Sequence, residues 1–146
     1  FEGERDEIHF SAFANLRMVR DIDESDQAEI GYFLERGETS DGRRAENLYR
    51  RIDTTPDDEP LKGGVKYLMI EDVKSIEFEY WDESKEIGDD GWVDEWEAGV
   101  KDDEIGEKEY VLPPRVRISL KVRGVDGKDL EFVTQSTIMI TEALDF

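Results

Sequence analysis

The sequence contains no cysteine and only one histidine, His9. The absence of thiols excludes disulfides, thiolate catalysis and cysteine-ligated zinc. The sequence also lacks the GxSxG, HExxH and glycine-rich phosphate-loop motifs that accompany common nucleophiles, zinc centres and nucleotides. His9 lies in an apolar segment, where a packed or surface position is more common than a catalytic one. We therefore predict no catalytic residue and no cofactor, although the abundant acids leave a hydrolase that uses paired carboxylates open.

Long apolar runs are also missing. No stretch approaches the roughly 20 apolar residues that cross a bilayer as a helix, and no secretory signal peptide is recognisable. The chain begins at Phe1 rather than Met. We therefore expect the full-length protein to have an N-terminal segment upstream of Phe1.

Basic residues are scarce relative to acidic ones. The chain has 19 Lys and Arg against 39 Asp and Glu, which gives a formal net charge of −20. This excess of carboxylates repels phosphate backbones and argues against nucleic acid as a partner. Apolar residues make up 37% of the 146 residues, including seven Phe, five Tyr and three Trp, and each aromatic can bury about 150–250 Å². We therefore predict one domain over 1–146 with a sizeable core.

Short alternating segments predict a protein rich in β-strands. The strand-like segments 30–34 and 47–52 flank the turn-like GETSDGRR at 37–44, which predicts a hairpin. The other elements expected in this half are a strand over 8–13, a loop over 53–64, and either a strand or a short helical turn over 65–73.

The segment KSIEFEYWD at 74–82 predicts a half-buried strand. Ile76, Phe78 and Tyr80 alternate with acidic residues, and alternate side chains of a strand point to opposite faces. These three side chains should therefore face a core.

The clearest hairpin is expected between 115–123 and 129–140. A three-residue loop, 125–127, would place apolar residues opposite apolar ones and basic residues opposite acidic ones. Gly127 would then occupy the left-handed position that such a loop requires. The predicted cross-strand pairs are Val122–Leu130, Leu120–Phe132, Lys121–Glu131 and Arg123–Asp129.

Between these strands lies an acidic connector, about 83–109, which contains Trp92 and Trp96. Paired acids could bind calcium weakly in an irregular loop, or could remain solvated. We predict no specific metal site, because the one stretch with a calcium-loop beginning, 21–32, lacks the required glycine and glutamate. The acidic clusters are at 57–58, 89–90 and 102–104.

Several stretches, taken in order, resemble one known family. They are FEGERDEIHFSAF (1–13), AEIGYFLER (28–36), NLYRRID (47–53), YLMIEDVKSIEFEYWD (67–82), and the Trp-containing connector followed by LPPRVRISL (112–120). Together they are similar to the minor pseudopilin J family of bacterial type II secretion systems. The resemblance covers nearly the whole chain.

The resemblance implies an α+β, pseudopilin-like fold, dominated by antiparallel β-sheet, whose N-terminal helix is missing or truncated in this chain. It implies a non-enzymatic subunit of a pseudopilus, in the tip complex with minor pseudopilins of the I and K types. Members are made as prepilins with a methylated N-terminus. The full-length protein would be held by a single-pass helix, with this truncated domain on the periplasmic face of the bacterial inner membrane. A type IV pilus minor pilin and a carbohydrate-binding β-rich module remain the alternatives.

Within this frame, five residues are candidates for structural or partner-contact roles. Tryptophan combines a broad apolar ring system with one N–H donor, so the two connector tryptophans could pin the connector onto a sheet. Alternatively, one of them could stay exposed as a contact for a partner. The prolines at 113–114 would stiffen the entry to the following strand. The candidates are Trp92, Trp96, Leu112, Pro113 and Arg115.

Overall fold

The computed structural model contains twelve β-strands among the residues it describes, and no helix in that part of the chain. The predicted dominance of antiparallel sheet is confirmed, because every strand pairing is antiparallel. The helical component of the expected α+β fold is not among the described residues. These residues are 1–13, 27–55, 61–85, 91–97, 101–102, 108–109 and 112–139.

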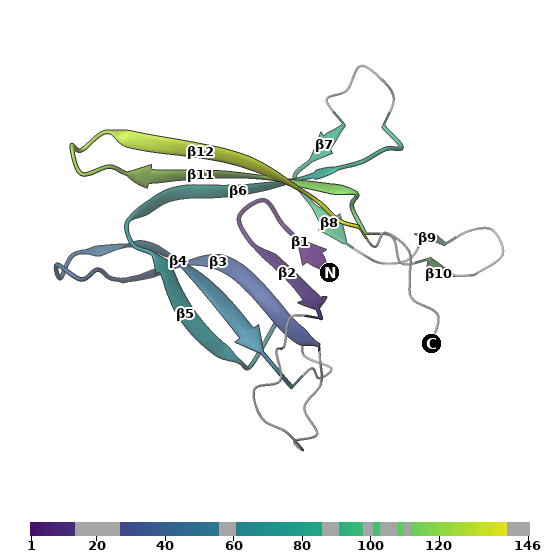
Figure 1. The fold of residues 1–146 in the computed structure, drawn as a ribbon, viewed down its shortest axis with the longest axis horizontal. Coiled ribbons are helices and arrows are strands. Elements are labelled where there is room, and N and C mark those ends of the chain that lie inside the picture. The colour runs from purple at the N-terminus through teal and green to yellow at the C-terminus, as the bar shows by residue number, and fades with distance from the viewer. Residues whose placement is uncertain are drawn as a thin grey trace.

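Six strands form the larger sheet (Figure 1), in the order β5-β4-β3-β2-β1-β8. The predicted hairpin around 37–44 is β3 and β4, whose strands are longer than the pattern indicated. The segment 65–73, which the sequence allowed as either a strand or a short helical turn, contains the edge strand β5. The bounds are β1 (Glu2–Gly3), β2 (Ile8–Ala12), β3 (Ala28–Glu38), β4 (Arg44–Asp53), β5 (Val65–Ile70) and β8 (Trp96–Glu97).

The second sheet has four strands, in the order β12-β11-β6-β7. A separate two-stranded pair is formed by β9 (Lys101–Asp102) and β10 (Lys108–Glu109). The region predicted as a connector therefore contributes short strands to all three sheets. The bounds of the second sheet are β6 (Val73–Trp81), β7 (Trp92–Val93), β11 (Arg115–Arg123) and β12 (Asp129–Thr137).

The β11–β12 hairpin has the predicted register. Val122 lies opposite Leu130, Leu120 opposite Phe132, Lys121 opposite Glu131 and Arg123 opposite Asp129. Gly127 has a φ of 78°, the left-handed conformation that glycine adopts without steric cost. The predicted strand 129–140 is correct through Thr137, where β12 ends.

Apolar side chains from both sheets share one core. Ile76, Phe78 and Tyr80 of β6 are buried, as their alternation predicted, together with Val116 of β11 and Leu48 of β4. The β1–β2 hairpin lies between the two groups of strands (Figure 1). Its turn reaches the part of β6 that β7 leaves unpaired, where the Phe78 N–H donates a hydrogen bond to the Arg5 carbonyl at 2.7 Å. This contact continues the hydrogen bonding of the second sheet into the first.

Tyr80 is the largest side chain at the centre of the core, with no exposed surface. Its hydroxyl donates a hydrogen bond to the Glu4 carbonyl at 3.0 Å, which satisfies the buried phenol. Burial raises the pKa of the Tyr80 hydroxyl above its ordinary value. Gly3 makes room for the ring, because a Cβ on Gly3 would lie 2.3 Å from Tyr80.

Candidate partner-contact surface

The outer face of the second sheet, opposite the core, gathers aromatic and basic side chains from three strands. Trp92 on β7 lies directly opposite Trp81 on β6, and their rings meet edge to face with centroids 5.2 Å apart. The chain reaches this position through Gly91, which has a φ of 66°. A Cβ on Gly91 would lie 2.7 Å from the Trp81 ring, so a larger residue there would displace the indole.

Two arginines of β11 lie against these rings. The Arg115 guanidinium is 4.5 Å from the Trp81 ring centroid and 5.8 Å from that of Trp92. The Arg117 guanidinium is 4.4 Å from the Trp92 centroid. Both distances to the nearer ring lie within the roughly 6 Å at which a cation is attracted to an aromatic face. We call Trp81, Trp92, Arg115 and Arg117 the Trp–Arg cluster.

The two arginines differ in their charge partners. Arg117 donates two hydrogen bonds to the Glu79 carboxylate, and these bonds lower the pKa of Glu79. Arg115 forms no ion pair with any residue that the structure describes, and its neighbour on β12 is the uncharged Thr137. In the cluster, the Arg117 guanidinium is therefore paired with a carboxylate, whereas the Arg115 guanidinium has no carboxylate partner among the described residues.

The five predicted candidates are divided among three places. Trp92 and Arg115 meet in the Trp–Arg cluster. Trp96 lies elsewhere, on β8, where it pairs with Gly3 of β1 and packs against the core. Pro113 is fully buried and Leu112 is partly buried, just before β11.

Trp81 and Arg117 belong to the cluster, and Glu79 pairs with Arg117, although the sequence pattern did not single out these residues. The sequence did contain a signal for Trp81. In the alternation of 74–82, Trp81 falls on the same face of the strand as the acidic residues, opposite the face of the apolar ones. The pairing of β6 with β11, which makes the residues neighbours, joins segments far apart in the sequence and could not be read from either segment alone.

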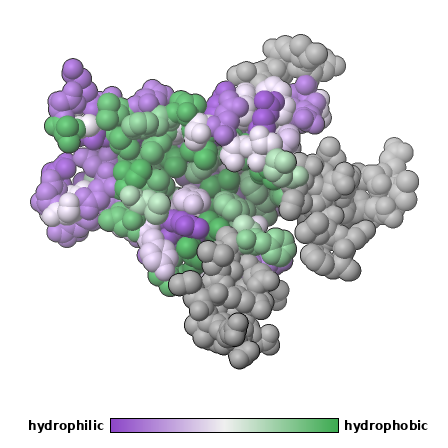
Figure 2. Space-filling view, in the orientation of Figure 1, coloured by the Kyte–Doolittle hydropathy of each residue, from purple (hydrophilic) through white to green (hydrophobic). Residues whose placement is uncertain are grey.

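Two sheet edges expose apolar side chains. On β12, Leu130, Phe132 and Val133 are about half exposed, and all nine residues of the strand are exposed. On β5, the apolar residues Val65, Tyr67, Leu68 and Met69 are also about half exposed. Figure 2 shows hydrophobic residues gathered over the middle of the visible face, with hydrophilic residues over the hairpin tips at its left. Such edges are open to pairing with another chain.

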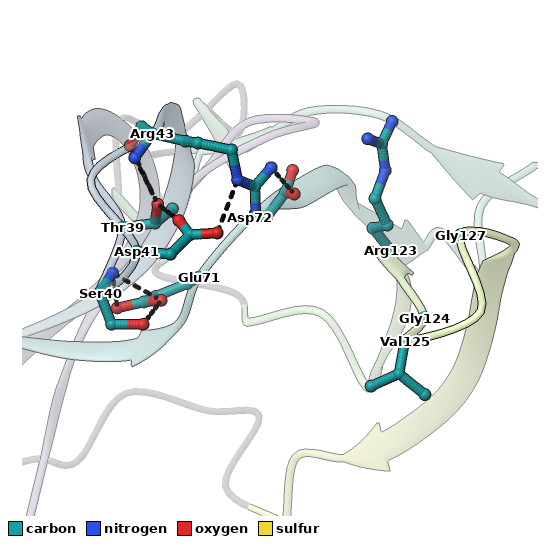
Figure 3. Close-up of a pocket in the computed structure, with 10 residues that line it drawn as sticks. All are labelled: Thr39, Ser40, Asp41, Arg43, Glu71, Asp72, Arg123, Gly124, Val125 and Gly127. Carbon is teal, nitrogen blue, oxygen red and sulfur yellow. Dashed lines mark hydrogen bonds and ion pairs between the residues drawn. The ribbon is translucent and has the colours of Figure 1, made fainter.

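A shallow polar depression lies where three turns converge (Figure 3). Arg43 of the β3–β4 turn forms ion pairs with Asp41 at 2.8 Å and with Asp72 at 3.1 Å. Glu71 accepts hydrogen bonds from the backbone and hydroxyl of Ser40. These contacts tie the β3–β4 turn to the β5–β6 turn, and the Arg123 side chain across the depression points away from them. The depression is thus explained as a junction between turns.

The Asp41 carboxyl in this junction should titrate with a pKa of about 2, lowered from 3.8 chiefly by the hydrogen bond from the Thr39 hydroxyl and then by that from Arg43. Because the folded pKa is depressed, the stabilisation is present above the unfolded pKa of 3.8 and is lost as the pH falls through about 2. Carboxyl carbon NMR titration would measure this pKa. Thr39→Val should raise it toward 3.8, and an unchanged value would contradict the role of the hydroxyl.

Within the described residues, no group of three or more His, Asp and Glu side chains could hold a metal ion. The acidic clusters considered for weak calcium binding, 57–58, 89–90 and 102–104, fall outside the described residues except for the backbone of Asp102. His9 is packed on β2, with its ring 6.3 Å from that of Phe33 and its Nε2 3.7 Å from the Glu7 carboxylate.

The geometry thus defines a domain of antiparallel sheets whose most developed surface features are exposed strand edges and a Trp–Arg cluster. The family model described as "Type II secretion system (T2SS), protein J" matches residues 2–134. The chain therefore belongs to the type II secretion protein J family, as the resemblance predicted, and is a pseudopilus subunit in secretion. A search of curated proteins found no match. None of the described residues forms a helix of the length and apolarity that a membrane crossing requires.

Proposed function

We propose that this chain is a non-enzymatic subunit of the pseudopilus tip complex, acting through contacts with minor pseudopilins of the I and K types. The observation that carries the proposal is the family match over residues 2–134. Residues 1–146 would form a single periplasmic domain. In the full-length protein a single-pass helix would hold this domain at the inner membrane, after N-terminal processing and methylation.

The exposed strand edges support a role in protein assembly. An edge strand presents unpaired N–H and C=O groups, which a partner strand can satisfy by extending the sheet. Monomeric proteins usually protect such edges with lysine, proline or a bulge. The charged residues of β12, Asp129 and Glu131, lie at its start; the strand has neither lysine nor proline, and its pairing with β11 runs without a register shift. An uninterrupted edge of this kind suits a subunit that is covered in its assembly.

The net charge of −20 favours partner binding through specific side chains over binding through general electrostatic attraction to the partner. A second acidic copy would be repelled at long range, so self-association is opposed. A hetero-assembly with other pseudopilins meets this constraint more easily. The family match favours this interpretation over the type IV pilus and carbohydrate-binding alternatives.

The proposal predicts a stoichiometric complex when this domain is mixed with the soluble domains of the I and K pseudopilins from the same genome. The mixture would be followed by light scattering on a sizing column at micromolar concentration. The binding of I to K in the same buffer is the control for competent partners. If I and K associate with each other but not with this domain, the tip-complex proposal is wrong for the periplasmic domain.

A further inference from the structure

Arg115 combines two features: it forms no ion pair with a described residue, and its guanidinium lies over two indole rings. Acidic residues outnumber basic ones by 39 to 19, and several of the described basic side chains are paired with a carboxylate. Of the described residues, Arg5, Arg43, Lys66 and Lys74 all form ion pairs with acidic side chains. Arg115 is half-buried and contacts the rings of Trp81 and Trp92 instead.

Stacking on an aromatic face has a consequence for the arginine. Contact with two rings restricts the Arg115 side chain, and the N–H groups of a guanidinium all lie in its plane. Those N–H groups match the two oxygens of a carboxylate, which accepts two parallel hydrogen bonds. Since the rings restrict the side chain before binding, less conformational entropy is lost when a carboxylate arrives.

The neighbouring groups favour an anion at this end of the sheet. Arg117 adds a second guanidinium 4.4 Å from the Trp92 centroid, and the one carboxylate of the described residues hydrogen-bonded to it is Glu79. The row across the sheet continues from Arg115 to the uncharged Thr137 on β12. Tryptophan and arginine are also the residue types that dominate binding energy at protein interfaces.

We infer that the Trp–Arg cluster is a docking site for an acidic segment of a partner protein, with Arg115 binding a carboxylate of that segment and Trp81 and Trp92 forming the platform beneath it. The identity of the partner as another pseudopilin rests on the proposed function. The carboxylate chemistry rests on the unpaired guanidinium of Arg115 that lies over the two rings.

The test compares Arg115→Gln with Arg123→Gln in binding to the I and K domains. Arg123 is the matched control, because it lies on the same strand and the same face, is exposed, and contacts no aromatic ring in the described part of the chain. Arg115→Gln should raise the Kd about 10-fold or more, as expected for a lost hydrogen bond to a charged group. Arg123→Gln should change it by less than about 3-fold, since exposed rim charges contribute little.

A second variant separates charge from geometry. Arg115→Lys keeps the positive charge but loses the planar pair of donors, so its Kd should also rise. Thermal unfolding of each variant would establish that it is folded. Binding by Arg115→Gln as tight as that of the unsubstituted domain, or an equal loss in Arg123→Gln, would overturn the docking site.

Failure of the proposed function would be distinguishable from failure of the docking site. If the unsubstituted domain binds neither I nor K, the tip-complex proposal fails, and the site is then judged with hexaglutamate as the probe. A saturable change in tryptophan fluorescence that is absent in Arg115→Gln and with hexaglutamine would support it. No change with hexaglutamate in the unsubstituted domain would overturn it.

Discussion

Phe78→Ala is expected to lower the free energy of unfolding by about 3–5 kcal/mol, the usual cost of truncating a buried phenylalanine. Phe78 is 2% exposed on β6, a central strand of the second sheet, and lies opposite Ile118 of β11. Truncation would leave a cavity bounded by two sheets whose backbones are held by hydrogen bonds, so little collapse can fill it. Against a total stability of about 5–15 kcal/mol, this loss is large. Urea denaturation would measure it.

The matched control is Phe132→Ala on the same face of the same sheet. Phe132 lies on β12 and is 56% exposed, so its truncation should cost less than about 1 kcal/mol. Equal effects of the two substitutions would mean that the inner face of β12 is covered in solution. This result would contradict the exposure of β12, on which its proposed role in assembly depends.

The parts of the fold that could be predicted are those fixed by local alternation. The register of β11 and β12 followed from the pattern, because the one-residue slip of a two-residue loop would place Val122 opposite Glu131 and not opposite Leu130. The burial of Phe78 and Tyr80 followed from the same periodicity. In both cases neighbouring residues in the sequence carry the whole signal.

Other parts depend on contacts between distant segments. β5 could not be assigned from VKYLMI, because both of its faces are partly exposed and no alternation marks a core side. The Trp–Arg cluster requires β6, β7 and β11 to be adjacent, and the paired residues Trp81 and Trp92 are separated by ten residues of sequence, the last of which is Gly91. The sequence therefore indicated Trp92 and Arg115 as candidates without indicating that they meet.

Arg51→Met is expected to cost about 3–5 kcal/mol, because it leaves a buried carboxylate without its partner. Arg51 on β4 and Glu29 on β3 are 3.8 Å apart, with side chains only 4% and 6% exposed. Arg51 also donates a hydrogen bond to the Lys62 carbonyl, which would lose that donor. Chemical denaturation at neutral pH would measure the loss. The exposed pair Lys66–Glu35, at 2.6 Å with side chains about half exposed, provides the control, and Lys66→Met should cost less than about 1 kcal/mol.

The double substitution Glu29→Leu/Arg51→Met completes this argument. Removing both charges abolishes the desolvation cost along with the attraction, so the double variant should be more stable than Arg51→Met alone. The difference from additivity should be about 0.5–3 kcal/mol, as found for residues in direct contact. Additive effects of Glu29→Leu and Arg51→Met would contradict a coupled pair. The two residues would then act separately, and the burial of charge on this face of the larger sheet would have to be compensated by other contacts, of which the Lys62 carbonyl is one.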